Sequence, residues 1–161
     1  MRLVKIIAAC AIVLMPLSVA SAQITPSLKT QVDAAAQPCG DVAGAAAGQS
    51  EAVAKSIAIA ALQPCYTALK TLDTFEKENS AGMSGEERNY FYYVGGNVIW
   101  MTAASETMKN DGRVTPAICQ QVLSAEQAWG NVNISRDTEL YREMLNNSLR
   151  TMLLPACTQQ Q

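Results

Sequence analysis

The sequence predicts an all-α protein, an irregular bundle of five or six helices stapled by two disulfides. In several segments, apolar residues recur at the spacing of three and four that one face of a helix requires. Capping residues, prolines and glycines separate these segments, and none of them shows sustained alternation of period two. With 161 residues, 49% of them apolar and 16% charged, the chain has the composition of a globular protein.

The charge balance and the absence of histidine narrow the functional classes. The chain has 12 basic and 14 acidic side chains, no histidine and a net charge of −2. Without a basic excess, the sequence gives no indication of nucleic-acid binding. Without histidine, it lacks the usual general base and the commonest metal ligand. We therefore expect a non-enzymatic protein with no catalytic residues, no cofactor and no metal site.

The first 22 residues have the pattern of a signal peptide. Arg2 and Lys5 precede an uncharged apolar stretch over residues 6–15, and an Ala-Ser-Ala sequence then supplies small residues at a cleavage site. This stretch is shorter than the roughly 20 residues of a membrane span. We expect cleavage after Ala22, export to the periplasm and a single helical domain over 23–161 without a membrane span. Loss of the two basic residues would change the net charge from −2 to −4.

Four cysteines follow Cys10, which lies in the signal peptide. An even number in an exported chain predicts two disulfides, although buried, reduced cysteines remain the alternative. Four cysteines allow three pairings, and the sequence does not decide among them. We favour Cys39 with Cys65, which closes over a glycine-rich stretch. We also favour Cys119 with Cys157. These two cysteines would lie near opposite ends of one helix-loop-helix unit, and an antiparallel arrangement of its helices brings those ends together.

Prolines and glycines bound the helices that we expect in the first half. A threonine-proline pair starts a helix over 26–37, which Pro38 should end. Residues 40–49 carry three glycines among alanines, and we expect mostly loop there. Ser50 can cap a second helix, which Pro64 should kink or restart.

The third helix has the clearest start in the chain. Ser84 and Glu87 form a capping box, in which each side chain accepts a hydrogen bond from the other residue's backbone. The helix should run to the Asn-Asp-Gly sequence at 110–112. Five methionines follow residue 22, and we expect them in the core rather than as copper ligands, since Met101 and Met108 fall on the apolar stripe of this helix.

Two more helices are expected in the last third of the chain. Thr115 and the proline after it start one helix, which ends at Gly130. Ser135 or Asp137 can cap the last helix, and Pro155 should end it.

The third expected helix contains a segment that is unusually rich in aromatic residues. Five of the nine aromatic residues after the signal peptide lie within eleven positions. Successive helix residues rotate by about 100°, so the first four of these side chains cannot all enter one core. Exposed aromatics are frequent anchors for protein partners. A central helix covered on all sides is the alternative that the sequence leaves open. The candidate partner-binding residues are Tyr90, Tyr92, Tyr93 and Trp100.

Two strings carry a resemblance to a known family. They are Tyr-Val-Gly-Gly at 93–96 and Ser-Leu-Arg-Thr-Met-Leu-Leu-Pro-Ala-Cys at 148–157. Together with the four cysteines, they resemble the periplasmic immunity proteins that neutralise cell-wall amidases of type VI secretion. The resemblance implies an inhibitor whose partner is a secreted toxin. An envelope chaperone or a secretion-system accessory protein is the alternative, and a homodimer stays open.

Overall fold

The computed structural model describes residues 26–158, and the expected signal peptide lies outside them. Six helices form this part of the chain, which confirms the predicted all-α bundle. The helices are α1 (Pro26–Gly44), α2 (Glu51–Asn79), α3 (Gly85–Lys109), α4 (Pro116–Gly130), α5 (Glu139–Leu145) and α6 (Ser148–Thr158).

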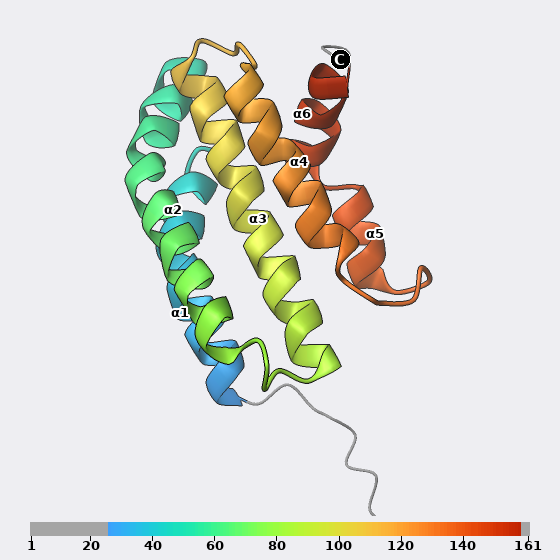
Figure 1. Ribbon diagram of the computed structural model, residues 1–161. Coiled ribbons are helices and arrows are strands. Elements are labelled where there is room, and N and C mark those ends of the chain that lie inside the picture. Colours follow the sequence, from blue (N-terminus) through green and yellow to red (C-terminus); the bar gives the residue numbers. More distant parts are fainter. Residues whose placement is uncertain (1–25, 159–161) are drawn as a thin grey trace, which may run out of the picture.

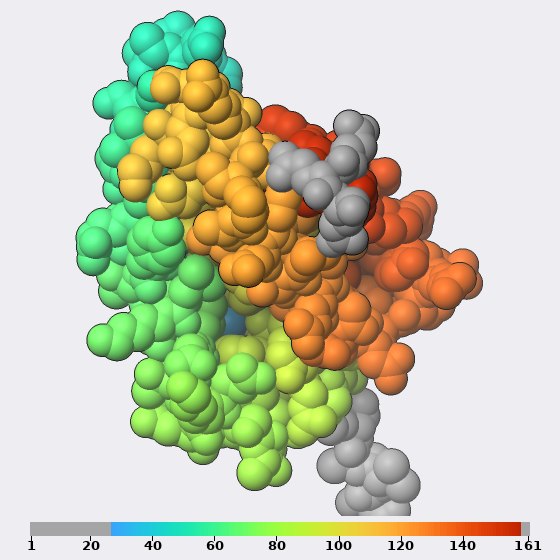
Figure 2. Space-filling model, turned by 45° about the horizontal axis from the view of Figure 1, so that its top comes forward, coloured from blue at the N-terminus to red at the C-terminus, as the bar shows by residue number. Residues whose placement is uncertain are grey.

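Helix α3 lies at the centre of the bundle. It packs against α1 and α2 on one side and α4 on the other, and α6 contacts both α3 and α4 (Figure 1). In the space-filling view, α2, α3 and α4 form one face, and α1 is visible only at the bottom of a hollow between them (Figure 2). The central position of α3 decides how its aromatic residues are used.

Two buried clusters meet at α3. The first lies among α1, α2 and α3 and includes Val32, Phe91 and Val98. The second is formed by α3, α4, α5 and α6 and includes Trp100 and Trp129. Since α3 contributes to both, its two sides hold the halves of the molecule together.

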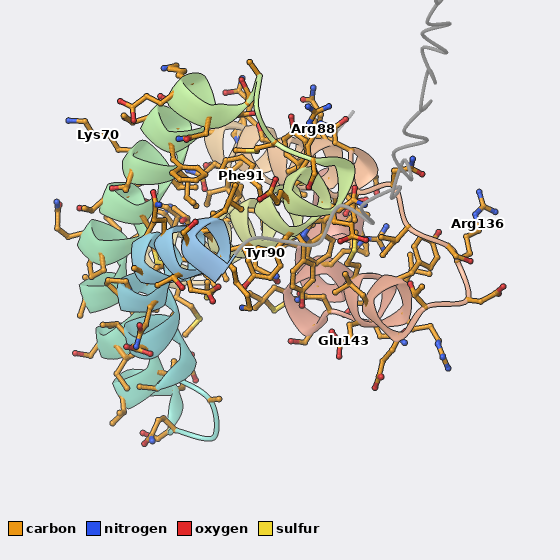
Figure 3. The ribbon with its side chains drawn as sticks, turned by 90° about the horizontal axis from the view of Figure 1, so that it is seen from below. Lys70, Arg88, Tyr90, Phe91, Arg136 and Glu143 are labelled. Atoms are coloured by element: carbon orange, nitrogen blue, oxygen red, sulfur yellow. A yellow bond between two sulfur atoms is a disulfide. The ribbon has the colours of Figure 1, made fainter. Side chains whose placement is uncertain are left out.

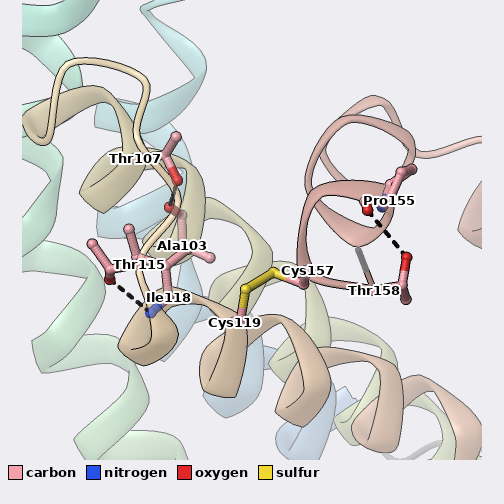
Figure 4. The surroundings of a disulfide bond; sticks show 8 residues. All are labelled: Ala103, Thr107, Thr115, Ile118, Cys119, Pro155, Cys157 and Thr158. Carbon is pink, nitrogen blue, oxygen red and sulfur yellow. Dashed lines mark hydrogen bonds between the residues drawn. A yellow bond between two sulfur atoms is a disulfide. The ribbon is translucent and has the colours of Figure 1, made fainter. Parts of the chain in front are cut away.

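Both favoured disulfides are confirmed. Cys39 and Cys65 join α1 to α2 with fully buried residues at a Cα–Cα distance of 4.4 Å. Cys119 and Cys157 join α4 to α6 at a Cα–Cα distance of 5.3 Å (Figure 4). Each disulfide links two helices that are already in contact. Each should add about 2–4 kcal/mol to the free energy of unfolding.

Two predicted helix starts are present as expected. The Ser84 hydroxyl accepts from the Glu87 amide at 3.2 Å, and the Glu87 carboxylate accepts from the Ser84 amide at 2.8 Å. In α4 the Thr115 hydroxyl accepts from the Ile118 amide at 3.3 Å (Figure 4).

Pro38 does not end a helix, contrary to our expectation, and α2 runs through Pro64 without restarting. Helix α1 continues past Pro38 to Gly44, so residues 40–44 are helical rather than loop, and Pro64 lies inside α2. A proline inside a helix costs about 3 kcal/mol. Each proline directly precedes a buried cysteine of the same disulfide, whose burial and cross-link offset that cost.

The expected last helix is two helices. Thr138, and neither Ser135 nor Asp137, caps α5 by accepting from the Tyr141 amide at 3.2 Å. The Asn147 side chain accepts from the backbone amides of the second and third residues after it, so it starts α6 as a separate helix. The predicted cap was wrong because three neighbouring polar residues offer similar caps.

Pro155 lies inside α6 rather than beyond its end. The helix continues to Thr158 because the disulfide of Cys157 holds its last turn against α4. Among the described residues, α2 alone is long and apolar enough to cross a membrane, by a test of length and composition that core helices of soluble proteins also pass.

Candidate functional site

Tyr90 joins α3 to α1 and is half-buried. Its hydroxyl donates to the Asp33 carboxylate, while the Lys29 ammonium donates to Asp33 at 2.7 Å and to the Tyr90 hydroxyl at 2.6 Å. The hydrogen bonds from Lys29 and Tyr90 lower the pKa of Asp33. Burial, followed by the hydrogen bond to Asp33, raises the pKa of Tyr90. A protonated tyrosine therefore joins the helices beside an ionised aspartate. Figure 3 shows Tyr90 between α3 and α1.

Tyr92 and Tyr93 leave α3 toward other helices. The Tyr92 hydroxyl donates to Glu76 of α2 at 3.0 Å, and burial followed by this bond raises the pKa of Tyr92. The Tyr93 hydroxyl lies 3.5 Å from Glu143 of α5, and its ring stacks on Trp129 of α4 at 6.5 Å between centroids. The three tyrosines are thus half-buried, and each hydroxyl is bonded to a carboxylate of a different helix.

Trp100 corrects the predicted partner-binding set. It is fully buried, with its ring centroid 5.8 Å from that of Trp129, so it is no surface anchor. The rotation of the aromatic residues around α3 was predicted correctly. However, each direction meets another helix, because α3 is central rather than peripheral.

The glycine pair serves packing within the chain. The Trp129 indole lies against Gly96, and its Nε1 donates to the Tyr93 carbonyl at 3.1 Å. A β-carbon at Gly95 would meet nothing within 4 Å. Gly96 therefore allows the Trp129 side chain of α4 to pack directly against the backbone of α3.

A pocket of about 540 Å³ lies among α1, α2, α3 and α6. We call it the apolar pocket. Its floor is one stripe of α3 that includes Asn97, Met101, Ser105 and Met108. Its walls come from three places: the end of α1 with the turn after it, the first two turns of α2, and the start of α6. This volume lies within the usual range for ligand pockets, about 300–1,000 Å³.

None of the fifteen residues that line the apolar pocket is ionisable. Its polar side chains are neutral hydroxyls and amides, such as those of Ser105 and Asn147. A serine needs a neighbouring base to act as a nucleophile, and a carboxylate or lysine is needed for most acid-base chemistry. The lining is therefore suited to binding an uncharged group.

The methionines are divided between the core and this pocket. Met83 and Met144 are buried, as expected for core packing. Met101 packs on the first cluster and also lines the pocket. Met152 is 56% exposed at the pocket wall, so the core interpretation is wrong for it. The i, i+7 spacing in α3 was the sequence signal for this stripe, but it did not show that part of the stripe is open.

Within residues 26–158, no group of three or more His, Cys, Asp or Glu side chains is placed to hold a metal ion. Comparisons with protein-family models, curated proteins and solved structures found no match to this chain.

Proposed function

We propose that this protein is a non-enzymatic binding protein of the periplasm that inhibits a secreted toxin, as the immunity proteins it resembles do. The observation that carries the proposal is the apolar pocket, whose lining has no ionisable side chain. Such a site can desolvate apolar groups of a partner, but it offers no acid, base or activated nucleophile.

Two disulfides support the same proposal. They cross-link α1 to α2 and α4 to α6, so the walls of the pocket on α1, α2 and α6 are each tied to a neighbour. A rigid, preorganised surface loses little conformational entropy on binding, which favours tight inhibition. Disulfides also persist in oxidising compartments such as the periplasm.

Purification from the native periplasm tests this proposal. The full chain, including residues 1–22, is expressed with a carboxyl-terminal tag, and we expect one partner at stoichiometric amounts. Cells that make this chain should survive the partner's toxicity, whereas cells that make residues 23–161 without the leader should not. Recovery of the protein alone, with no protection, would contradict the proposal.

An envelope chaperone is the second candidate, and the methionines of the apolar pocket favour it. Met101, Met108 and Met152 are flexible and polarisable, which suits surfaces that adapt to several partners. In the same purification, a chaperone would bring down many unfolded clients at low amounts. It would also suppress aggregation of an unrelated denatured protein, which a specific inhibitor would not do.

A further inference from the structure

We propose that the apolar pocket binds a short amphipathic helix of the partner, with an uncharged apolar face and basic residues beside it. This inference rests on the proposed function as a protein-binding protein. It adds the kind of partner segment, the place where it binds and the charge that it carries.

The pocket occupies a vacant helix position in the bundle. The Cys39–Cys65 disulfide places these two residues side by side. Helix α1 ends at Gly44, five residues beyond Cys39, whereas α2 begins at Glu51, fourteen residues before Cys65. At 1.5 Å per residue, α2 extends about 13 Å past the end of α1. Figure 1 shows α1 ending well below the top of α2. The space beyond α1 lies beside α2, α3 and α6, where a further helix would continue the line of α1.

The dimensions fit three side chains of one helix face. Helices that bind in grooves usually insert anchors at positions i, i+3 or i+4, and i+7, which span about 10 Å along the axis. A cavity of about 150 Å³ can hold a benzene molecule. The apolar pocket, at about 540 Å³, therefore has room for about three such anchors.

The charges at the rim favour a basic partner. Three basic residues adjoin lining residues in sequence, and each pairs with a carboxylate: Lys55 with Asp111, Lys109 with Glu106, and Arg150 with Glu126.

Asp41 and Glu51 each lie three residues from a lining residue, Gly44 and Ala54 respectively, on either side of the α1–α2 turn. Both are exposed, and neither forms an ion pair within residues 26–158. The unpaired charge at this rim is therefore acidic, so basic residues that flank the apolar face of a helix would be attracted.

Ser105 supplies a neutral hydroxyl to this lining, and the residue is 3% exposed. A bound segment that places a polar atom within hydrogen-bond distance of this hydroxyl would gain affinity.

A designed peptide is the probe. It has about 14 residues with capped ends, leucine at positions i, i+4 and i+7, and lysine and alanine elsewhere, so that three leucines share one helix face. Its control is a scrambled peptide of identical composition, which lacks that face. Binding to the oxidised mature chain is measured by calorimetry, and the peptide's helicity by circular dichroism. We expect saturable one-to-one binding of the patterned peptide, at least tenfold tighter than the scrambled one, with a gain in helicity.

Two tryptophan substitutions in α2 test the place of binding. Ala54 lines the apolar pocket, whereas Ala60 lies exposed elsewhere on the same helix. Ala54→Trp should fill the pocket and weaken peptide binding at least tenfold, and Ala60→Trp should leave it unchanged. If Ala54→Trp unfolds the chain, Ala47→Trp in the exposed turn fills the same space without altering a helix.

The double variant Asp41→Asn, Glu51→Gln tests the charge. The double variant should bind the lysine peptide about threefold to tenfold more weakly at low salt. A version of the peptide with glutamate in place of lysine should bind the unsubstituted protein more weakly than the lysine version does.

Equal binding of the patterned and scrambled peptides, or of the Ala54→Trp and Ala60→Trp variants, would overturn the inference. So would a fatty acid that binds in the pocket and displaces the peptide, because the occupant would then be a lipid chain. If a stoichiometric partner protects cells and still binds the Ala54→Trp protein at full strength, the proposed function stands and only this inference fails.

Discussion

At Gly96 the packing of α4 on α3 depends on a missing side chain. An ideal β-carbon at this position would lie 2.3 Å from both Cδ1 and Nε1 of Trp129. Trp129 is itself fixed by its hydrogen bond to the Tyr93 carbonyl and by its contact with Trp100. The indole therefore has little freedom to move away, and the backbone of α3 must remain bare here.

Gly96→Ala should destabilise the protein by about 1–3 kcal/mol, because the added methyl overpacks a rigid contact. Gly95→Ala is the matched control, since its β-carbon would meet nothing within 4 Å. Alanine is the better helix former, so this neighbour should be neutral or stabilised by up to about 1 kcal/mol. Urea unfolding followed by tryptophan fluorescence measures both variants. Similar losses in both variants would show that the contact with Trp129 does not distinguish Gly96 from Gly95.

The tyrosines of α3 should make the fold sensitive to alkali. Burial raises the pKa of Tyr90 and Tyr92 above the usual value of 10.0, so folding favours their protonated hydroxyls. This contribution is complete below pH 10 and is lost as the pH rises through the raised pKa values of the folded state. We expect the free energy of unfolding to fall above about pH 10. The decrease should be smaller in Tyr92→Phe, and tyrosinate absorbance should appear together with unfolding. An unchanged alkaline decrease in Tyr92→Phe would argue against Tyr92 as a source.

At the scale of elements, local signals located helix starts better than helix ends. The capping box of Ser84 and the threonine-proline start at Thr115 are local hydrogen-bonding patterns, and both are present. Pro38 is a local signal for a helix end and Pro64 for a kink or restart, yet both lie inside helices, because a buried disulfide follows directly after each. The stabilisation that a disulfide between distant residues gives to a helix cannot be estimated from the local sequence around a proline.

Removing each disulfide should therefore loosen a different element. The double variant Cys39→Ala, Cys65→Ala should lose about 2–5 kcal/mol of unfolding free energy and expose α1 beyond Pro38 to amide exchange, because the proline's cost is no longer offset. The corresponding variant of Cys119 and Cys157 should leave α1 protected and raise exchange in α6. Hydrogen-exchange mass spectrometry maps both. Equal exchange of α1 in the two variants would contradict this assignment.

For the whole molecule, the site depends on the relative lengths of helices more than on any motif. The apolar pocket exists because α1 ends short of α2, while α6 returns to α3 on the other side. Met101 and Met108 could be placed on one face of α3 from their spacing, but whether another helix covers that face depends on where α1 ends. Likewise, the sequence could predict that the tyrosine side chains point in different directions around α3, but their burial follows from the central position of α3 in the bundle.

The same central helix should make the molecule unfold as one unit. Val32 is fully buried in the first cluster, whereas both tryptophans belong to the second. Val32→Ala should cost about 1–3 kcal/mol. If α3 couples the clusters, this loss should lower the unfolding midpoint seen by tryptophan fluorescence as much as the midpoint seen by circular dichroism.

Val53→Ala, at a position that is 45% exposed on α2, serves as the control and should change both midpoints little. If Val32→Ala lowered only the circular dichroism midpoint, the two clusters would unfold separately, and α3 would be a boundary between them. Coincident shifts would instead mean that a partner bound in the apolar pocket, beside α1, α2, α3 and α6, stabilises both clusters at once. The partner's binding free energy would then appear as a single shift of the whole unfolding transition.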